Sequence, residues 1–206
     1  MKTSNLIRLT HLSKESRMMG TAEETEEARD LNAFSPVDSI YGLIDLMEIA
    51  DIKNKVIVEI GSYLGVSTET FLLHEPKKMY AIDPWGIDFG YGEANGFLPS
   101  GGWKEIEQKF RDRVKSYKNI EIIKNLSVKA AEEFEEESLD FVYIDGNHDS
   151  CFVAQDIEIW WPKIKQNGYM GGHDFYVEFD GLVGVEATVY NYFGHQAYLD
   201  NHVKAF

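Results

Sequence analysis

From residue 38 onward, short apolar runs alternate along the chain with segments that carry apolar residues on one helical face. This alternation predicts an α/β fold with a mostly parallel sheet and helices on both of its faces, because parallel strands need crossover connections. We expect strands at residues 56–60, 79–83, 120–124, 139–145, 169–173 and 196–199. We expect helices at residues 66–74, 103–116, 127–136, 150–161 and 183–192.

One further helix is expected before the first strand. Ile40, Leu43 and Met47 have helical spacing, and Ser39 is a candidate N-cap for that helix. Residues 1–37 are polar and show no clean periodicity, which indicates an N-terminal arm. Residues 38–206 then form one doubly wound domain, since the β-α units are too few for a closed eight-stranded barrel.

Composition and charge narrow the classes of partner. The chain has 35 acidic and 20 basic side chains and a formal net charge of −15, which repels nucleic acid and anionic membrane surfaces. Cys151 is the single cysteine, no apolar run is long enough to span a bilayer, and the first residues lack the apolar core of a signal peptide. We therefore expect a cytoplasmic protein with a small-molecule partner, as a monomer or a homo-oligomer.

The connection from Gly86 to Gly102 is long and contains six glycines together with Phe89, Tyr91 and Phe97. Long loops of this kind are often lids over a binding site. The alternative is a surface insertion without function, and the sequence leaves both open.

A glycine turn follows the first expected strand. Gly61 and Gly65 stand between that strand and the next helix, where backbone N–H groups meet a ligand without a Cβ in the way. Their spacing is not the G-x-G-x-x-G of dinucleotide sites. Glu59 before the turn suits a cationic ligand better than a diphosphate, and Asp83 after the second strand is placed to accept ribose hydroxyls.

The segments 58–65 and 80–85 resemble class I S-adenosylmethionine-dependent methyltransferases, of the branch that includes macrocin-type and cephalosporin-cluster small-molecule O-methyltransferases. The resemblance implies a Rossmann-like fold, with S-adenosylmethionine held by the glycine turn and by the acid after the second strand. The resemblance assigns cofactor binding to Gly61, Ser62, Gly65 and Asp83, with Trp85 as a candidate for contact with the adenine face. The further candidates for cofactor binding are Glu59, Tyr63, Ser67 and Asp145. Trp85 has a second interpretation as an ordinary core aromatic.

Two later strands are expected to end in polar groups at the same edge of the sheet. Asp145 ends one of them, and His173 and Asp174 end the next. If these strands are neighbours, their ends lie about 4.8 Å apart, and the three side chains form a candidate site for Mg²⁺ or Mn²⁺. The related methyltransferases carry an acid where His173 stands, and the alternative is that these residues only contact cofactor or water.

His148 follows Asp145 by three residues, where the catechol-type relatives carry a lysine base. An imidazole titrates near neutral pH, so His148 is a candidate proton acceptor for a hydroxyl nucleophile, with Asp145 beside it as the second catalytic candidate. A purely structural histidine is the alternative.

These observations together predict an enzyme that transfers a methyl group from S-adenosylmethionine to a small hydroxylated acceptor such as a sugar, a polyketide or a phenol. Two other functions remain open at this point, because fold alone does not decide function. They are a nucleotide-dependent oxidoreductase and a non-catalytic cofactor-binding domain.

Overall fold

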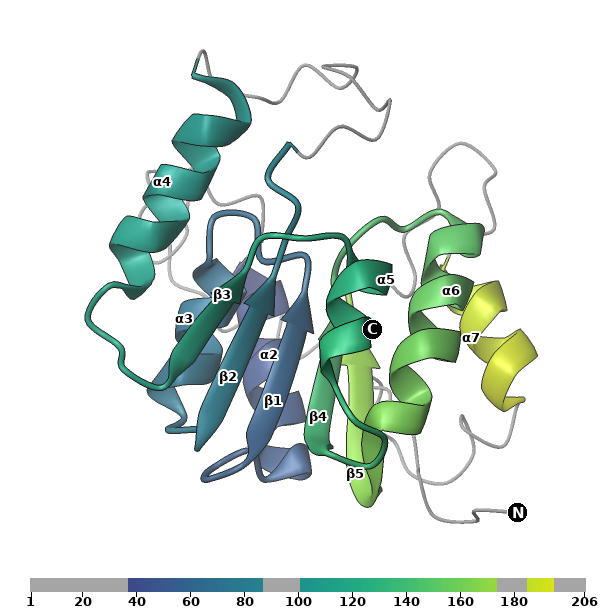
Figure 1. Ribbon diagram of the computed structural model, residues 1–206. Coiled ribbons are helices and arrows are strands. Elements are labelled where there is room, and N and C mark those ends of the chain that lie inside the picture. The colour runs from purple at the N-terminus through teal and green to yellow at the C-terminus, as the bar shows by residue number, and fades with distance from the viewer. Residues whose placement is uncertain (1–36, 87–100, 174–184, 195–206) are drawn as a thin grey trace.

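The computed structural model describes residues 37–86, 101–173 and 185–194. Within these ranges the chain forms a parallel five-stranded sheet in the order β3-β2-β1-β4-β5 (Figure 1). The strands are β1 (Val56–Ile60), β2 (Lys78–Ile82), β3 (Ile120–Ile123), β4 (Leu139–Ile144) and β5 (Ile164–Gly172). This arrangement confirms the expected Rossmann-like α/β fold.

Helices cover both faces of the sheet (Figure 1). One face is packed by α2 (Val37–Ala50), α3 (Val66–Leu73) and α4 (Gly102–Val114). The other face is packed by α5 (Ser127–Ala130), α6 (Ser150–Trp160) and α7 (Val185–Phe193). The sheet therefore has one hydrophobic core on each face, and successive residues of a strand point into opposite cores. Ile57 and Met79 pack against α2, α3 and α4, whereas Val58 and Val142 pack against α5, α6 and α7.

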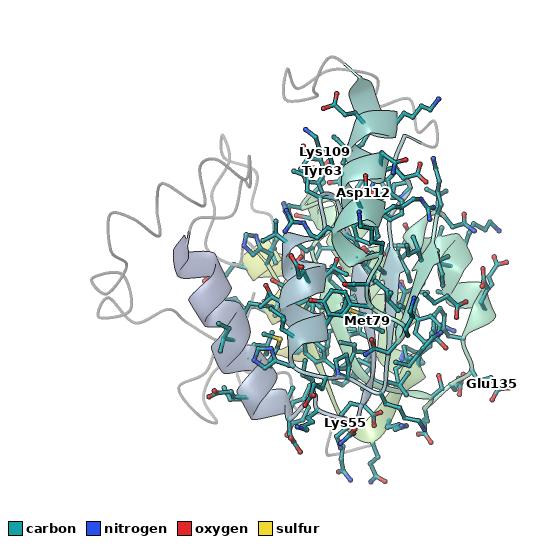
Figure 2. The ribbon with its side chains drawn as sticks, turned by 90° about the vertical axis from the view of Figure 1, so that its left-hand side faces the viewer. Lys55, Tyr63, Met79, Lys109, Asp112 and Glu135 are labelled. Atoms are coloured by element: carbon teal, nitrogen blue, oxygen red, sulfur yellow. The ribbon has the colours of Figure 1, made fainter. Side chains whose placement is uncertain are left out.

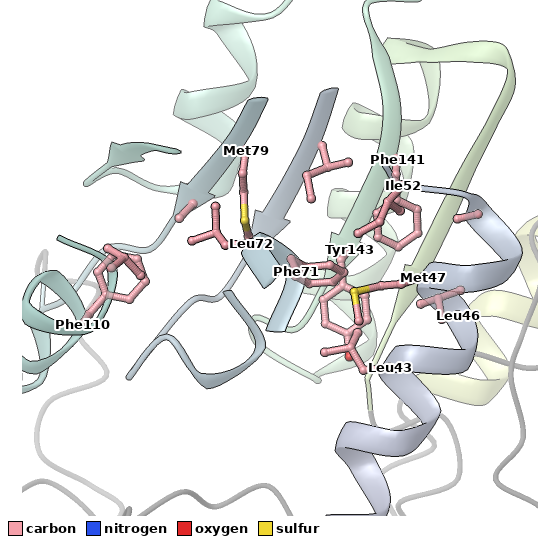
Figure 3. Packing of buried hydrophobic residues seen from close by; sticks show 14 of the residues in the cluster. Leu43, Leu46, Met47, Ile52, Phe71, Leu72, Met79, Phe110, Phe141 and Tyr143 are labelled. Atoms are coloured by element: carbon pink, nitrogen blue, oxygen red, sulfur yellow. The ribbon is translucent and has the colours of Figure 1, made fainter. Parts of the chain in front are cut away.

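Aromatic side chains fill the centre of the first core (Figure 3). Phe71 of α3 contacts two residues of β4, with ring centroids 5.8 Å from Phe141 and 5.3 Å from Tyr143. Met47 of α2 is buried beside them. These contacts fix α3, and with it the turn that leads from β1 into α3, against the sheet.

The chain departs from the expected elements at three places. Ser39 lies inside α2, which begins at Val37, so the expected N-cap at Ser39 is wrong. The helix expected at 127–136 ends at Ala130 and continues only as one 3₁₀ turn at Ala131–Glu133. The reason is Phe134, whose backbone is extended and whose ring packs between Tyr80 and Trp160.

The third departure is β5, which begins at Ile164 instead of residue 169. The first part of β5 is polar, and its pairing with β4 is irregular between Leu139 and Phe141. This part of the strand therefore lacks the apolar pattern by which strands are predicted from sequence. The strand expected at 196–199, most of the arm at 1–37 and most of the candidate lid at 86–102 lie outside the described residues. No helix among the described residues is long and apolar enough to cross a membrane.

The strand order places the topological switch point of the sheet between β1 and β4. The chain leaves β1 toward α3 on one face, and leaves the neighbouring strand β4 toward α6 on the other face. The connections therefore diverge at the carboxyl ends of β1 and β4, which is where open α/β sheets bind ligands.

Candidate functional site at the carboxyl edge of the sheet

Backbone hydrogen bonds continue across the sheet just beyond the strand ends. Gly61 N–H donates to Ile82 O at 2.8 Å, and Asp145 N–H donates to Ile60 O at 2.8 Å. His173 N–H donates to Ile144 O at 3.0 Å. The first residues after β1, β4 and β5 are thereby held in one row, with Asp83 following β2 at the same edge.

The glycine turn can be built only with glycine at its first position. Gly61 has φ +89°, and a Cβ there would lie 2.0 Å from the carbonyl oxygen of Asp145. Gly65 has φ +81° and caps α3, and a Cβ there would lie 2.7 Å from Phe110 Cδ2. Both glycines thus allow other parts of the protein to pack closely against the turn, and their predicted contact with a ligand stays a prediction.

The turn between these glycines is tied to its surroundings at several points. Tyr63 N–H donates to Asp83 Oδ2 at 2.8 Å, and Trp85 Nε1 donates to Tyr63 O at 2.9 Å. Arg113 of α4 donates from Nε to Leu64 O at 3.0 Å. Figure 2 shows Tyr63 beside α4, and its ring makes an edge contact with Trp103 at 6.3 Å between centroids. The turn is thus held in one conformation.

Glu59 is completely buried beneath the turn. Its carboxylate accepts hydrogen bonds from Ser62 Oγ at 2.9 Å, from Ser67 Oγ at 2.5 Å and from Thr68 Oγ1. Burial raises the pKa of Glu59 to about 7, although the three hydroxyls oppose that rise. The hydroxyls of Ser62 and Ser67 face this carboxylate, so here they stabilise the turn; their contact with cofactor stays a prediction.

Both carboxylate oxygens of Asp83 accept hydrogen bonds from backbone N–H groups. Oδ2 accepts from Tyr63, and Oδ1 accepts from Trp85 at 2.7 Å. Burial raises the pKa of Asp83 to about 6, and these N–H groups work against that shift. The N–H of Ser62 also donates to this carboxylate. Tyr63 and Trp85 both have positive φ, +42° and +36°, so two of the residues that donate to Asp83 have a strained backbone.

Trp85 is buried against Phe110, with ring centroids 4.7 Å apart. This is the environment of the core-aromatic interpretation. Its predicted contact with adenine is untested, and it would require the indole ring to become accessible.

Asp145, His148 and His173 gather at the ends of β4 and β5. Asp145 Oδ1 lies 3.4 Å from His148 Nε2 and 3.6 Å from His173 Nδ1. One ligand atom from each of the three residues lies within 4.8 Å of the others, and all three side chains are half-buried. The structure thus brings together Asp145 and His173, as the sequence predicted, and adds His148 to them; Asp174 lies outside the described residues.

A buried carboxylate below this cluster was not predicted from the sequence. Asp156 of α6 accepts a hydrogen bond from Ser127 Oγ at 2.5 Å, and Trp160 Nε1 donates to the same hydroxyl at 2.8 Å. Burial raises the pKa of Asp156 to about 6. The available signal was that Asp156 shares the buried stripe of α6 with Val153 and Trp160, where a charge is unusual.

Comparison with solved structures supports the fold. The O-methyltransferase of Bacillus cereus in complex with SAH is 15% identical, with a TM-score of 0.54 over 84% of this chain and 79% of that one. Phosphoethanolamine N-methyltransferase 1 of Haemonchus contortus, in complex with phosphoethanolamine and S-adenosylhomocysteine, is 19% identical, with a TM-score of 0.51 over 80% of this chain and 31% of that one. The SAM-dependent O-methyltransferase of Thermotoga maritima is 12% identical, with a TM-score of 0.50 over 73% and 49%.

The chain spans less than two thirds of the length of several matched structures, including the Haemonchus and Thermotoga proteins. At these identities the likeness concerns the fold. No curated protein matches the chain significantly.

A family model described as a methyltransferase domain matches residues 58–175, which is more than half of the chain. The matched segment contains the glycine turn, Asp83, Asp145 and both histidines of the cluster. This match favours the expected transferase over an oxidoreductase. The chain belongs to the methyltransferase-domain family.

Proposed function

We propose that the chain is a class I methyltransferase that moves the methyl group of S-adenosylmethionine to a hydroxyl oxygen of a small acceptor. The observation that carries this proposal is the row formed by Gly61, Asp83 and Asp145 at the diverging connections of the sheet, in a chain of the methyltransferase family. The fold is shared with the Bacillus cereus O-methyltransferase that was solved with SAH.

The methyl donor has a positively charged sulfonium and an ammonium group, and its ribose has two hydroxyls. The first N–H groups of α3 would meet its carboxylate, since most N–H groups of the turn itself already donate to Ile82, Ser62 and Asp83. The carboxylate of Asp83 accepts hydrogen bonds from the backbone N–H groups of Ser62, Tyr63 and Trp85, and its two oxygens have further acceptor capacity for ribose hydroxyls. Glu59 below the turn supplies negative charge whenever it is ionised.

The acceptor would lie over Asp145 and His148, beyond the donor. A hydroxyl oxygen has to lose its proton as the new carbon–oxygen bond forms and the carbon–sulfur bond of the donor breaks to release S-adenosylhomocysteine. His148 would accept that proton while Asp145 orients the imidazole. The rest of the protein's contribution is to position both reactants in line and to exclude water. We place the chain with the macrocin-type and cephalosporin-cluster relatives on the resemblance of segments 58–65 and 80–85.

Calorimetry with three ligands tests the donor. We expect S-adenosylmethionine and S-adenosylhomocysteine to bind with one site per chain, and NAD to give no heat. Binding of NAD without either methionine derivative would overturn the proposal in favour of the oxidoreductase.

Labelled methyl transfer tests the acceptor class. Sugars, phenols and polyketides are incubated with the protein and donor carrying a labelled methyl group, and matched compounds in which the hydroxyl is replaced by hydrogen serve as controls. Label that appears on the hydroxyl compounds alone supports O-methylation. Matched amines are included in the same panel, and label that appears on them in place of the hydroxyl compounds would contradict it.

A further inference from the structure

The cluster of Asp145, His148 and His173 combines two nitrogen donors with one carboxylate. Two atoms that bind one ion at about 2.1 Å lie about 3.0–3.4 Å apart when the angle between them is near 90° or tetrahedral. The two distances to Asp145 Oδ1, 3.4 Å and 3.6 Å, are close to that separation. The three ligand atoms all lie within 4.8 Å of one another, so side-chain rotations that bring the two imidazole nitrogens to the same separation would allow the three residues to bind one ion.

The chemistry of the donors selects the class of ion. Mg²⁺ prefers a shell of oxygen ligands and water, and two imidazoles replace oxygens that it would require. Imidazole suits Zn²⁺, Co²⁺, Ni²⁺ and Fe²⁺, which bind mixed nitrogen and oxygen sets. The cluster carries one negative charge when the imidazoles are neutral, which fits a divalent ion that keeps open positions for water or a substrate oxygen.

The backbone holds the three donors in place independently of any ion. His173 N–H donates to Ile144 O, so His173 stays beside the end of β4. Asn147 Oδ1 accepts the N–H of Asp149 at 2.8 Å and shapes the loop that turns His148 back toward Asp145. The two imidazole rings have centroids 6.5 Å apart, so both rings lie beside the Asp145 carboxylate.

We propose that Asp145, His148 and His173 bind one divalent first-row transition-metal ion of the Zn²⁺ and Co²⁺ class in preference to Mg²⁺. This ion replaces the Mg²⁺ or Mn²⁺ expected from the sequence. His148 becomes a ligand in the metal-loaded protein and remains a candidate proton acceptor only in the metal-free one. The inference goes beyond the proposed methyl transfer, because ion binding is measured with neither donor nor acceptor present.

Direct binding tests the proposal on tag-free, full-length protein that has been stripped with chelator and dialysed. We expect one equivalent of Zn²⁺ by elemental analysis, and Co²⁺ to give a visible absorption spectrum that Zn²⁺ abolishes. Millimolar Mg²⁺ should leave that spectrum unchanged, since its affinity is expected to be at least about 100-fold lower. Displacement of Co²⁺ by an equal concentration of Mg²⁺ would overturn the proposal.

Variants identify the ligands. His148→Ala and His173→Ala should each weaken Zn²⁺ binding by at least about 10-fold to 100-fold. His74→Ala is the matched control, because His74 lies at the end of α3, where its Nδ1 is hydrogen-bonded to Thr70 O, and it should leave affinity unchanged. Thermal unfolding checks that each variant is folded.

Nitrogen NMR of the imidazoles supplies a readout on the folded wild type, in case a variant fails to fold. The ring signals of His148 and His173 should shift together on addition of one equivalent of Zn²⁺, and those of His74 should not. If His148→Ala retains full Zn²⁺ affinity while Asp174→Ala abolishes it, the ligand set includes Asp174 in place of His148, and the proposal is wrong.

Discussion

Gly61 lies against the backbone of Asp145 so closely that a Cβ at position 61 would be 2.0 Å from the Asp145 carbonyl oxygen. The turn after β1 and the end of β4 are therefore in direct backbone contact at the point where their connections diverge. The consequence is that the glycine turn and the Asp145 cluster form one structural unit, although they lie far apart in the sequence.

Gly61→Ala should be strongly destabilising. The methyl group meets backbone that does not rotate away, and the residue also has φ +89°, a conformation that costs a non-glycine residue about 1–2 kcal/mol. We expect a loss in the free energy of unfolding of more than about 2 kcal/mol, measured by urea denaturation.

The control for this prediction is Gly194→Ala. Gly194 has φ +66°, and no neighbouring atom of the described residues lies within 4 Å of its Cβ position, so the substitution should cost only the conformational penalty. Equal losses in the two variants would mean that the contact between Gly61 and Asp145 does not limit stability.

The features that the sequence predicted best are those set by local pattern. The strand at 56–60 and the glycines after it are found where expected. A buried strand requires consecutive apolar residues and a turn with positive φ requires glycine, so both features can be recognised from neighbouring residues in the sequence. Asp83 and Asp145 are shifted by one position, from the last residue of a strand to the first residue after it. This shift leaves both at the same edge.

The features that were missed depend on contacts between distant segments. Thr68 joins the hydroxyls on Glu59 only because α3 packs over β1, and Asp156 is satisfied by Ser127, which is 29 residues away. The sequence predicts His148 as a proton acceptor and not as part of the metal site. Its approach to His173 depends on both the β4-β5 pairing and the conformation of the loop after Asp145. Spacing along the chain does not determine that conformation.

Glu59 should make the stability of the protein fall with rising pH. Its pKa is raised from 4.5 to about 7 by burial, so the folded state holds its proton more tightly than the unfolded state. The stabilisation is fully present below about pH 4.5 and is lost as the pH rises through about 7. Glu59→Gln removes this titration, and the difference between wild type and variant should change by up to about 3 kcal/mol between pH 5 and pH 8 in urea denaturation.

The difference between the two proteins isolates Glu59 from Asp83 and Asp156, whose raised pKa values act in the same direction in both. Glu75→Gln is the control, because the pKa of Glu75 is lowered by its hydrogen bond and ion pair with Lys53 and its titration lies below this range. A constant difference between wild type and Glu59→Gln from pH 5 to pH 8 would show that Glu59 stays ionised throughout.

Asp83→Ala should weaken the binding of S-adenosylmethionine and S-adenosylhomocysteine alike, because the ribose is common to both. The loss is about 1.5–3 kcal/mol for each hydrogen bond to the charged acceptor, measured by calorimetry at pH 8, where Asp83 is ionised. Asp83→Asn, which keeps one acceptor oxygen, should lie between wild type and alanine.

Asp140→Asn separates ligand binding from stability in this experiment. Asp140 also accepts a backbone N–H, from Val56 at 2.9 Å, but it does so near the start of β4, at the opposite edge of the sheet. Both aspartates should therefore contribute to the free energy of unfolding, while only Asp83 should affect the affinity for the donor. Equal loss of donor affinity at the two positions would indicate a general effect on the fold.

The double variant of His148 and His173 distinguishes a shared ion from separate roles in catalysis. Each single change to alanine should lower kcat by roughly 10²-fold to 10⁴-fold with little change in donor affinity, since the proposed donor contacts are made by the glycine turn and Asp83 and not by the two imidazoles. Residues that act through one ion lose their function together, so the double variant should be no slower than the slower single one. His74→Ala should retain the wild-type rate. If the two losses multiply in the double variant, His148 and His173 act independently, and His148 is the proton acceptor that the sequence predicted.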